Sequence, residues 1–178
     1  FEHFATHNAV YLVTGSDKKK TLEQITPAIY NLAIRVYNCS GNDVWEQYNH
    51  IRSNQLTITD DFRSHLVGLV ESSKFKHKTG NHLEERPGLL NFSIVGRNCG
   101  TINRNRYIEW DNITNERKDI ARELDLIYGD QYDIGIAGET GIDITNKGAN
   151  KSQILQDFDD TDTILFFGDR TEVGGNDH

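Results

Sequence analysis

The stretch TILFFGDRTEVGGNDH occupies residues 163–178 and changes abruptly from apolar to polar. Its first five residues predict a buried strand over 163–167 that ends in an acidic, glycine-containing loop. A second run of this kind, AVYLVT at residues 9–14, ends at Gly15-Ser16-Asp17. Ligands of open α/β sheets bind beyond the carboxyl ends of the strands, so both polar loops are expected on the ligand side of one sheet.

The segment between the two apolar runs mixes helical and strand patterns. A helix is predicted over residues 18–34, N-capped by Asp17 or Ser16 and interrupted at Pro27. Apolar periodicity predicts further helices over 59–73, 115–128 and 152–158, strands over 34–37, 89–95, 132–137 and 141–144, and a polar loop over 74–81. This order indicates an α/β core interrupted by a mixed insertion.

Composition excludes several classes of function. The net charge of −8 gives no support for a nucleic-acid partner, and no apolar run approaches the ~18 residues of a membrane span. The two cysteines, Cys39 and Cys99, do not form a disulfide framework, and without a targeting segment a reducing, cytoplasmic location is expected. His3 and His7 lack a third zinc ligand, and no Walker A, CxxC, GxGxxG or GxSxG motif occurs.

The C-terminal loop is the strongest candidate for a metal site. Hard cations such as Mg²⁺ prefer carboxylate and amide oxygens together with phosphate and water. Asp169 is the predicted direct ligand, with Asn176 and Asp177 closing the loop. The structural alternative is an acidic surface turn, because turns favour the same residue types.

Two further segments could hold a phosphate. Ser16 stands at a strand-to-helix junction, where free backbone amides and a hydroxyl can bind a phosphate oxygen, although it can equally be a simple N-cap. Lys151 precedes a predicted helix and could neutralise a phosphoryl group, although a lone lysine is usually a solvated surface residue.

Four arginines cluster in the middle of the chain. Arginine binds phosphate through two parallel hydrogen bonds, so several arginines on one small sheet could form a phosphate-binding pocket. The alternative is a surface of mixed charge. The cluster consists of Arg86, Arg97, Arg104 and Arg106.

The order of these features, GSD, arginine segment, lysine and GD…GGND, resembles the haloacid dehalogenase (HAD) superfamily with a cap inserted between its second and third motifs. More closely, the chain resembles eukaryotic-type phosphomannomutases. The segments that carry this resemblance are VTGSD (13–17), RPGLLNFSIVGRNC (86–99), RNRYIEWD (104–111) and FFGDRTEVGGNDH (166–178), with a looser likeness over 135–151.

The resemblance implies a division of the chain and a reaction. The HAD-like core, with a partial parallel sheet, would comprise residues 1–55 and 147–178, and the α/β cap residues 56–146. Such enzymes interconvert mannose 6-phosphate and mannose 1-phosphate, the precursor of GDP-mannose, through a phospho-aspartate, with Mg²⁺ and a hexose bisphosphate activator. They handle small hexose phosphates, and a homodimer through the cap is expected by analogy only.

The resemblance also assigns roles to individual residues. Ser16 and Lys151 would hold the transferring phosphoryl group, and Asp169, Asn176 and Asp177 would complete the Mg²⁺ site. The distal phosphate would bind the cap arginines, and the sugar would contact a loop of the cap. The implied substrate-binding set is Arg86, Arg97, Arg104, Glu139, Gly141 and Asp143.

The chain departs from the family pattern in several places. No Asp-x-Asp-Gly-Thr nucleophile motif and no methionine occur, so we expect a fragment that is cut at both ends and inactive by itself. Thr14, Gly141 and Asn150 stand where such enzymes commonly have glycine, serine and an acid. A HAD-type sugar-phosphate phosphatase and a sugar-phosphate-binding module without a nucleophile are the alternatives.

Overall fold

The computed structural model describes residues 1–169, 171 and 177, and the chain divides into two compact units. Unit 1 comprises Phe1–Gln55, Arg86–Leu89 and Gly148–His178. Unit 2 comprises Leu56–Glu85 and Leu90–Lys147. Within the described residues, none of the helices has both the length and the apolar character needed to cross a bilayer.

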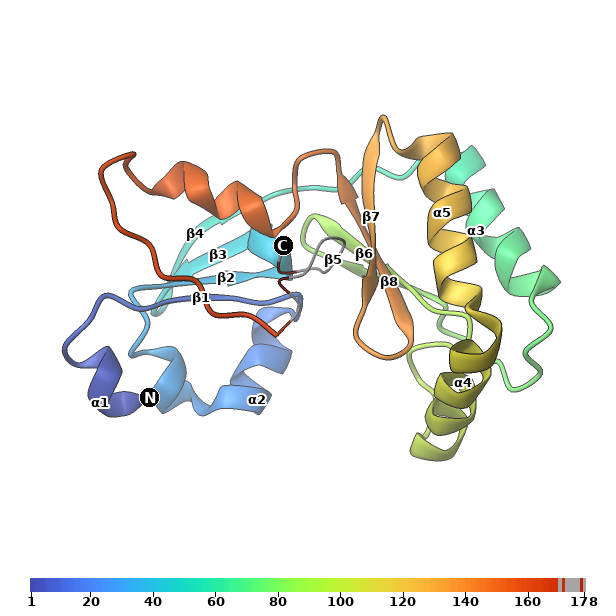
Figure 1. Cartoon of the computed structure of the whole chain (residues 1–178), viewed down its shortest axis with the longest axis horizontal. Helices are drawn as coiled ribbons and strands as arrows, with labels where there is room; N and C mark the ends of the chain where they lie inside the picture. Colours follow the sequence, from blue (N-terminus) through green and yellow to red (C-terminus); the bar gives the residue numbers. More distant parts are fainter. Residues whose placement is uncertain (170, 172–176, 178) are drawn as a thin grey trace. The chain divides into compact units, whose positions relative to one another are not determined.

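Unit 1 is built around a four-stranded sheet with strand order β1-β2-β3-β4 (Figure 1). Strands β1 and β2 are parallel, whereas β2 with β3 and β3 with β4 are antiparallel. The elements are α1 (Glu2–Ala5), β1 (Tyr11–Val13), α2 (Lys18–Tyr30), β2 (Arg35–Asn38), η1 (Cys39–Gly41), β3 (Asp43–Glu46), β4 (Asn49–Ser53) and η2 (Lys151–Asp157).

Helix α2 follows the signals in its sequence. The Asp17 carboxylate accepts a hydrogen bond from the Lys20 amide at 2.8 Å and caps the helix, as predicted. Proline disfavours helical geometry in the residue before it, and Thr26, which precedes Pro27, has a φ of 63°. The predicted interruption at Pro27 is therefore confirmed as a kink.

The two faces of this sheet pack against different segments (Figure 1). Val36 is buried with Tyr30 and Ala33 from the α2 segment. Because successive side chains of a strand point to opposite faces, the neighbouring Arg35 points to the other face. There it forms an ion pair with Asp157 of η2 at 3.1 Å. Helix α2 thus covers one face, and η2 is bound to the other.

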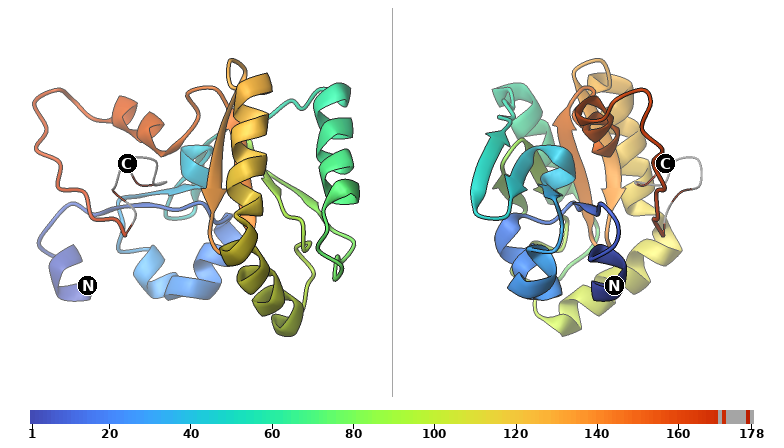
Figure 2. Two further views of the ribbon diagram at one scale, coloured as in Figure 1. Left: turned by 45° about the vertical axis from the view of Figure 1, so that its right-hand side comes forward. Right: turned by 90° about the vertical axis from the view of Figure 1, so that its left-hand side faces the viewer.

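Unit 2 combines a second four-stranded sheet with three long helices. The strand order is β5-β6-β8-β7, with β7 and β8 antiparallel. The elements are α3 (Asp60–Ser72), β5 (Leu83–Arg86), β6 (Leu89–Phe92), α4 (Thr101–Thr114), α5 (Glu116–Tyr128), β7 (Tyr132–Ala137) and β8 (Gly141–Asn146). The three helices lie on the same side of the sheet (Figures 1 and 2).

One hydrophobic core joins those helices to the sheet. It includes Phe62 of α3, Tyr107 of α4, Leu124 of α5, Phe92 of β6 and Ile142 of β8, each at most 1% exposed. Strand alternation then directs Asn91, Gly141 and Asp143 to the opposite face, which no helix of unit 2 covers. We call this side the helix-free face of unit 2.

Two expectations from the sequence are wrong. Residues 163–167 do not form a buried strand, and the apolar side chains of 164–167 are 45% to 82% exposed. A strand needs a neighbour for its backbone hydrogen bonds, and no described strand pairs with this segment. Arg104 and Arg106 do not lie on a sheet, because they belong to helix α4.

The other predicted elements are present with shifted ends. The predicted strand over 89–95 ends at Phe92, and the predicted helix over 152–158 is the 3₁₀ helix η2. The helices predicted over 59–73 and 115–128 correspond to α3 and α5. The β3–β4 hairpin, β5 and α4 are not predicted from the sequence.

Candidate active site

The loop after β1 joins the loop after β2 at one edge of the first sheet. The amide of Ser40 donates to the Thr14 carbonyl at 2.8 Å, and the amide of Cys39 donates to the Ser16 carbonyl at 2.9 Å. The Ser16 amide also donates to Thr14 Oγ1 at 3.1 Å. Thr14, which replaces the glycine expected from the family pattern, therefore orders the loop that presents Ser16.

Arg86 belongs with this loop. Arg86–Leu89 comprises the end of β5, the turn and the first residue of β6, yet these residues are part of unit 1. The Arg86 guanidinium donates to the Gly15 carbonyl at 3.1 Å. The resemblance placed Arg86 in the cap, whereas the structure groups it with the Ser16 loop.

Lys151 lies at the start of η2. Side-chain amide groups bind this helix to the loop after β2 of the first sheet. Asn150 caps η2 by accepting from the Ser152 amide at 2.9 Å. Gln153 Nε2 donates to the carbonyls of Ser40 at 2.8 Å and Ala149 at 2.9 Å. Asn42 Nδ2 also donates to the Ala149 carbonyl at 2.8 Å. The backbone on both sides of Lys151 is thereby fixed to the loop after β2.

Two ion pairs hold the C-terminal end of η2. Asp157 contacts Arg52 at 2.7 Å and Arg35 at 3.1 Å. Burial alone would raise the pKa of Asp157, but the hydrogen bond from Arg52 and the nearby positive charges outweigh it. The pKa of Asp157 therefore lies below its ordinary value of 3.8.

Lys151 forms an ion pair with Asp177, whose side chain is only 7% exposed. A Cβ atom added to Gly168 would lie 2.8 Å from the Asp177 Cβ, so glycine permits this close approach. Asp169 follows directly and is exposed, and Asn176 lies outside the described residues. Carboxylates are the donors that Mg²⁺ prefers, so the donor set fits this ion. Among residues 1–169, 171 and 177 no group of three acidic, histidine or cysteine side chains is placed to hold a metal.

The helix-free face of unit 2 carries a charged and amide-bearing array. Arg97 Nε donates to Glu84 at 2.8 Å, and the Arg97 side chain is only 17% exposed. Asn91 Nδ2 donates to Asp143 Oδ1 at 2.5 Å. Asn91 is 4% exposed, and its side-chain carbonyl oxygen has no hydrogen-bond partner among the described residues. The array can bind an anion through Arg97 and a hydroxyl group through Asp143.

Arg104 and Glu139 form a second charged pair in unit 2. Arg104 on α4 donates to the Glu139 carboxylate at 3.1 Å, and Glu139 lies in the turn between β7 and β8. Both side chains are substantially exposed, so the pair is worth about 1 kcal/mol at most. Arg104 is therefore available to a stronger anion such as phosphate.

A family model for eukaryotic phosphomannomutase matches residues 1–178. The chain belongs to the eukaryotic phosphomannomutase family. A probable phosphomannomutase from Caenorhabditis elegans is 33% identical, with 94% of this chain and 70% of the relative covered. The phosphomannomutase of Arabidopsis thaliana is 30% identical, with 94% and 71% covered. The family predicted from the sequence is confirmed.

The fold is similar to that of a solved sugar-phosphate phosphatase. The C-terminal domain of Candida albicans trehalose-6-phosphate phosphatase matches with a TM-score of 0.51 at 14% identity. The match covers 87% of this phosphomannomutase-family chain and 48% of the solved chain, so the chain spans about half the length of that structure. The predicted HAD-type α/β fold class is confirmed.

The structure adds residues that the sequence did not single out. Asn91 sits inside an apolar strand, and its alternation with Leu90 and Phe92 is the only signal that it faces away from the core. Asn42 binds the Ala149 carbonyl and Gln153 binds the Ser40 carbonyl, and each pair is distant in sequence and meets only through the fold. No local pattern could have predicted these contacts.

Proposed function

We propose that this protein acts in the interconversion of mannose 6-phosphate and mannose 1-phosphate through a phospho-aspartate. Asp169, Asp177 and Asn176 would hold Mg²⁺, which neutralises phosphate charge during transfer. No Asp-x-Asp-Gly-Thr occurs in the 178 residues, and a residue outside them would supply the nucleophile. The chain's own residues would bind and orient the substrate.

Unit 1 would hold the transferring phosphoryl group. Lys151 supplies a positive charge, and the amides that flank it keep its backbone fixed. Ser16 supplies a hydroxyl in the ordered loop after β1. Phosphoryl transfer depends mainly on positioning and charge stabilisation, and fixed donors perform both.

Unit 2 would bind the distal phosphate and the sugar. The Arg97 and Arg104 guanidinium groups would exchange their carboxylate partners for phosphate oxygens. Asp143, oriented by Asn91, would accept hydrogen bonds from sugar hydroxyls. Gly141 would contact the sugar only through its backbone. Arg86, which lies with the Ser16 loop in unit 1, would bind phosphate there.

The array of Arg97, Asn91 and Asp143 on the helix-free face carries this proposal. Arg97 is a cation that can bind a phosphate, and Asp143 is an oriented carboxylate that can bind a hydroxyl group. A hexose phosphate carries both groups. A hydrophobic ligand would gain nothing from it.

The test is to incubate the complete gene product with mannose 1-phosphate, Mg²⁺ and a hexose bisphosphate, and to follow the products by phosphorus NMR. Accumulation of mannose 6-phosphate is expected. Free phosphate without the isomer would instead support a sugar-phosphate phosphatase, in which water resolves the phospho-aspartate.

The non-catalytic alternative is a sugar-phosphate-binding module, which would use the same Arg97 and Asp143 side chains. The 178-residue chain is expected to bind mannose 1-phosphate in calorimetry without converting it. Turnover by this polypeptide would contradict that expectation. A mutase activity confined to the complete gene product would dismiss the module.

A further inference from the structure

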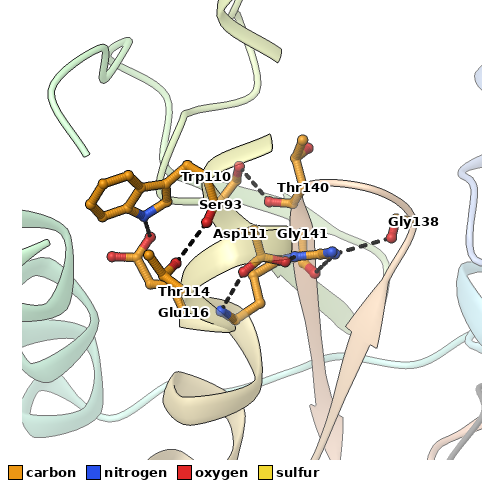
Figure 3. A network of polar contacts seen from close by, with 9 residues as sticks. Ser93, Trp110, Asp111, Thr114, Glu116, Gly138, Thr140 and Gly141 are labelled. Atoms are coloured by element: carbon orange, nitrogen blue, oxygen red, sulfur yellow. Dashed lines mark hydrogen bonds and ion pairs between the residues drawn. The ribbon is translucent and has the colours of Figure 1, made fainter. Parts of the chain in front are cut away.

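Arg117 connects the start of α5 to the turn between β7 and β8. Its partners Asp111, Gly138 and Gly141 are labelled in Figure 3. Its Nη1 donates to the carbonyl oxygens of Gly138 at 3.0 Å and Gly141 at 3.5 Å. Its Nε donates to Asp111 Oδ2 at 2.8 Å, and its backbone amide donates to Asp111 Oδ1 at 2.8 Å. One arginine therefore joins α4, α5 and the hairpin turn.

This ion pair is largely buried. The side chain of Arg117 is 12% exposed and that of Asp111 is 9% exposed. A buried ion pair is weak evidence for stability, because apolar side chains of similar volume are often as stabilising. The pair does fix geometry, because the planar guanidinium sets the angle between the groups that it binds.

The turn is also fixed on a second side. Ser93 Oγ donates to the Thr140 carbonyl at 2.9 Å, and Thr140 is 2% exposed (Figure 3). Both ends of the turn and its centre are therefore hydrogen-bonded, although its glycines would otherwise allow many conformations. These hydrogen bonds therefore also restrict the positions of the side chains in the turn.

The turn and the start of β8 present three residues of the proposed substrate-binding set. Glu139 lies in the turn, Gly141 begins β8, and Asp143 follows on the helix-free face. Arg104 reaches the same turn from α4. A shift of the turn would therefore move the sugar-contacting carboxylate relative to the arginine that binds phosphate.

We propose that Arg117, held by Asp111, is a positioning residue that sets the β7–β8 turn for hexose phosphate binding. This inference rests on the proposed function, because it assigns substrate contact to the residues that the turn carries. Arg117 does not touch the substrate, and it acts through the carbonyl oxygens of Gly138 and Gly141.

The test compares Arg117→Lys with the wild-type chain and with Arg122→Ala. Lysine keeps the positive charge beside Asp111, so the variant is expected to fold, but it cannot reproduce the guanidinium fork. Arg122 lies on the same helix, is 75% exposed and pairs only with Asp119 among the ion pairs of the described residues. Mannose 1-phosphate binding is measured by calorimetry, and amide exchange over residues 138–141 by hydrogen–deuterium exchange.

Arg117→Lys is expected to weaken mannose 1-phosphate binding by about ten-fold and to accelerate exchange in the turn, whereas Arg122→Ala changes neither. Wild-type binding and turn protection in Arg117→Lys would overturn the inference. Faster exchange without weaker binding would also overturn it, because the role would then be structural only.

The same experiment separates this inference from the proposed function. If the wild-type chain does not bind mannose 1-phosphate, the proposed function fails. If the wild-type chain does bind and Arg117→Lys binds with the same affinity, the positioning role fails and the proposed function stands.

Discussion

Asn91 Nδ2 donates a hydrogen bond of 2.5 Å to Asp143 Oδ1 across neighbouring strands of the second sheet. Asn91 is 4% exposed, so this amide is a fixed part of the sheet and not a mobile surface group. The contact leaves the Asp143 carboxylate in one orientation. A carboxylate that is oriented before the ligand arrives binds with a smaller entropic cost.

Replacement of Asn91 tests that orientation. Asn91→Ala is expected to weaken mannose 1-phosphate binding by about ten-fold, because the charged Asp143 carboxylate loses the hydrogen bond that it accepts from Asn91. Calorimetry on the folded variant checks this, with Asn112→Ala, an exposed position on α4, as the control. Unchanged affinity in Asn91→Ala would show that Asn91 does not orient Asp143 for binding.

Glu139 is expected to compete with phosphate for Arg104. Glu139→Gln removes this competing charge and is expected to strengthen phosphate binding by up to about five-fold, the range of an exposed ion pair. Titration with mannose 1-phosphate at low and high salt measures the effect. Glu109→Gln, which removes an exposed acid from α4, controls for the change of net charge. Weaker binding in Glu139→Gln would instead support the sugar contact predicted from the sequence.

Lys151 is expected to act on the reacting phosphoryl group. In the complete gene product, Lys151→Met is expected to lower kcat by about a hundred-fold and to change KM much less. Steady-state kinetics of mannose 6-phosphate formation provide the measurement. Lys147→Met is the control, because Lys147 is 57% exposed and pairs with Asp133 in unit 2. A rise in KM at constant kcat would indicate uniform substrate binding only.

Asp157 gives unit 1 a defined response to acid. Its pKa is lowered in the folded chain, so its contribution to stability is fully present above the ordinary value of 3.8. That contribution is lost as the pH falls through the lower folded value. Asp157→Asn is expected to cost about 2 kcal/mol of unfolding free energy at neutral pH.

Urea unfolding at successively lower pH checks this prediction. The difference between wild type and Asp157→Asn is expected to shrink only in the acid range below the ordinary carboxyl pKa. A difference that stays constant throughout that range would show that the ion pairs with Arg35 and Arg52 contribute nothing to stability.

Local signals in the sequence predicted much of the fold. The Asp17 cap and the Pro27 interruption depend on neighbouring residues, and both are present in α2. The strand predicted over 163–167 is wrong. An apolar run favours burial, but it does not show whether a neighbouring strand is present to pair with it. Helix α4 has a weak amphipathic pattern, because one of its buried positions is occupied by the charged Asp111 where an apolar residue is usual.

The candidate site was predictable only in part. Ser16, Lys151 and Asp177 could be proposed from short segments, and Lys151 and Asp177 do meet in unit 1. The contacts of Asn91 with Asp143 and of Arg117 with Gly138 join residues 52 and 21 positions apart, and these partners are set by strand pairing and helix packing. Long-range contacts of this kind carry no local sequence signal.

NMR titration of the isotope-labelled chain with mannose 1-phosphate tests the central claim most directly, that unit 2 binds a hexose phosphate on its helix-free face. The largest amide and side-chain shifts are expected at Arg97, Asn91 and Asp143, with Arg104 next. Saturable shifts confined to α3 and α5, with those residues unperturbed, would contradict the account.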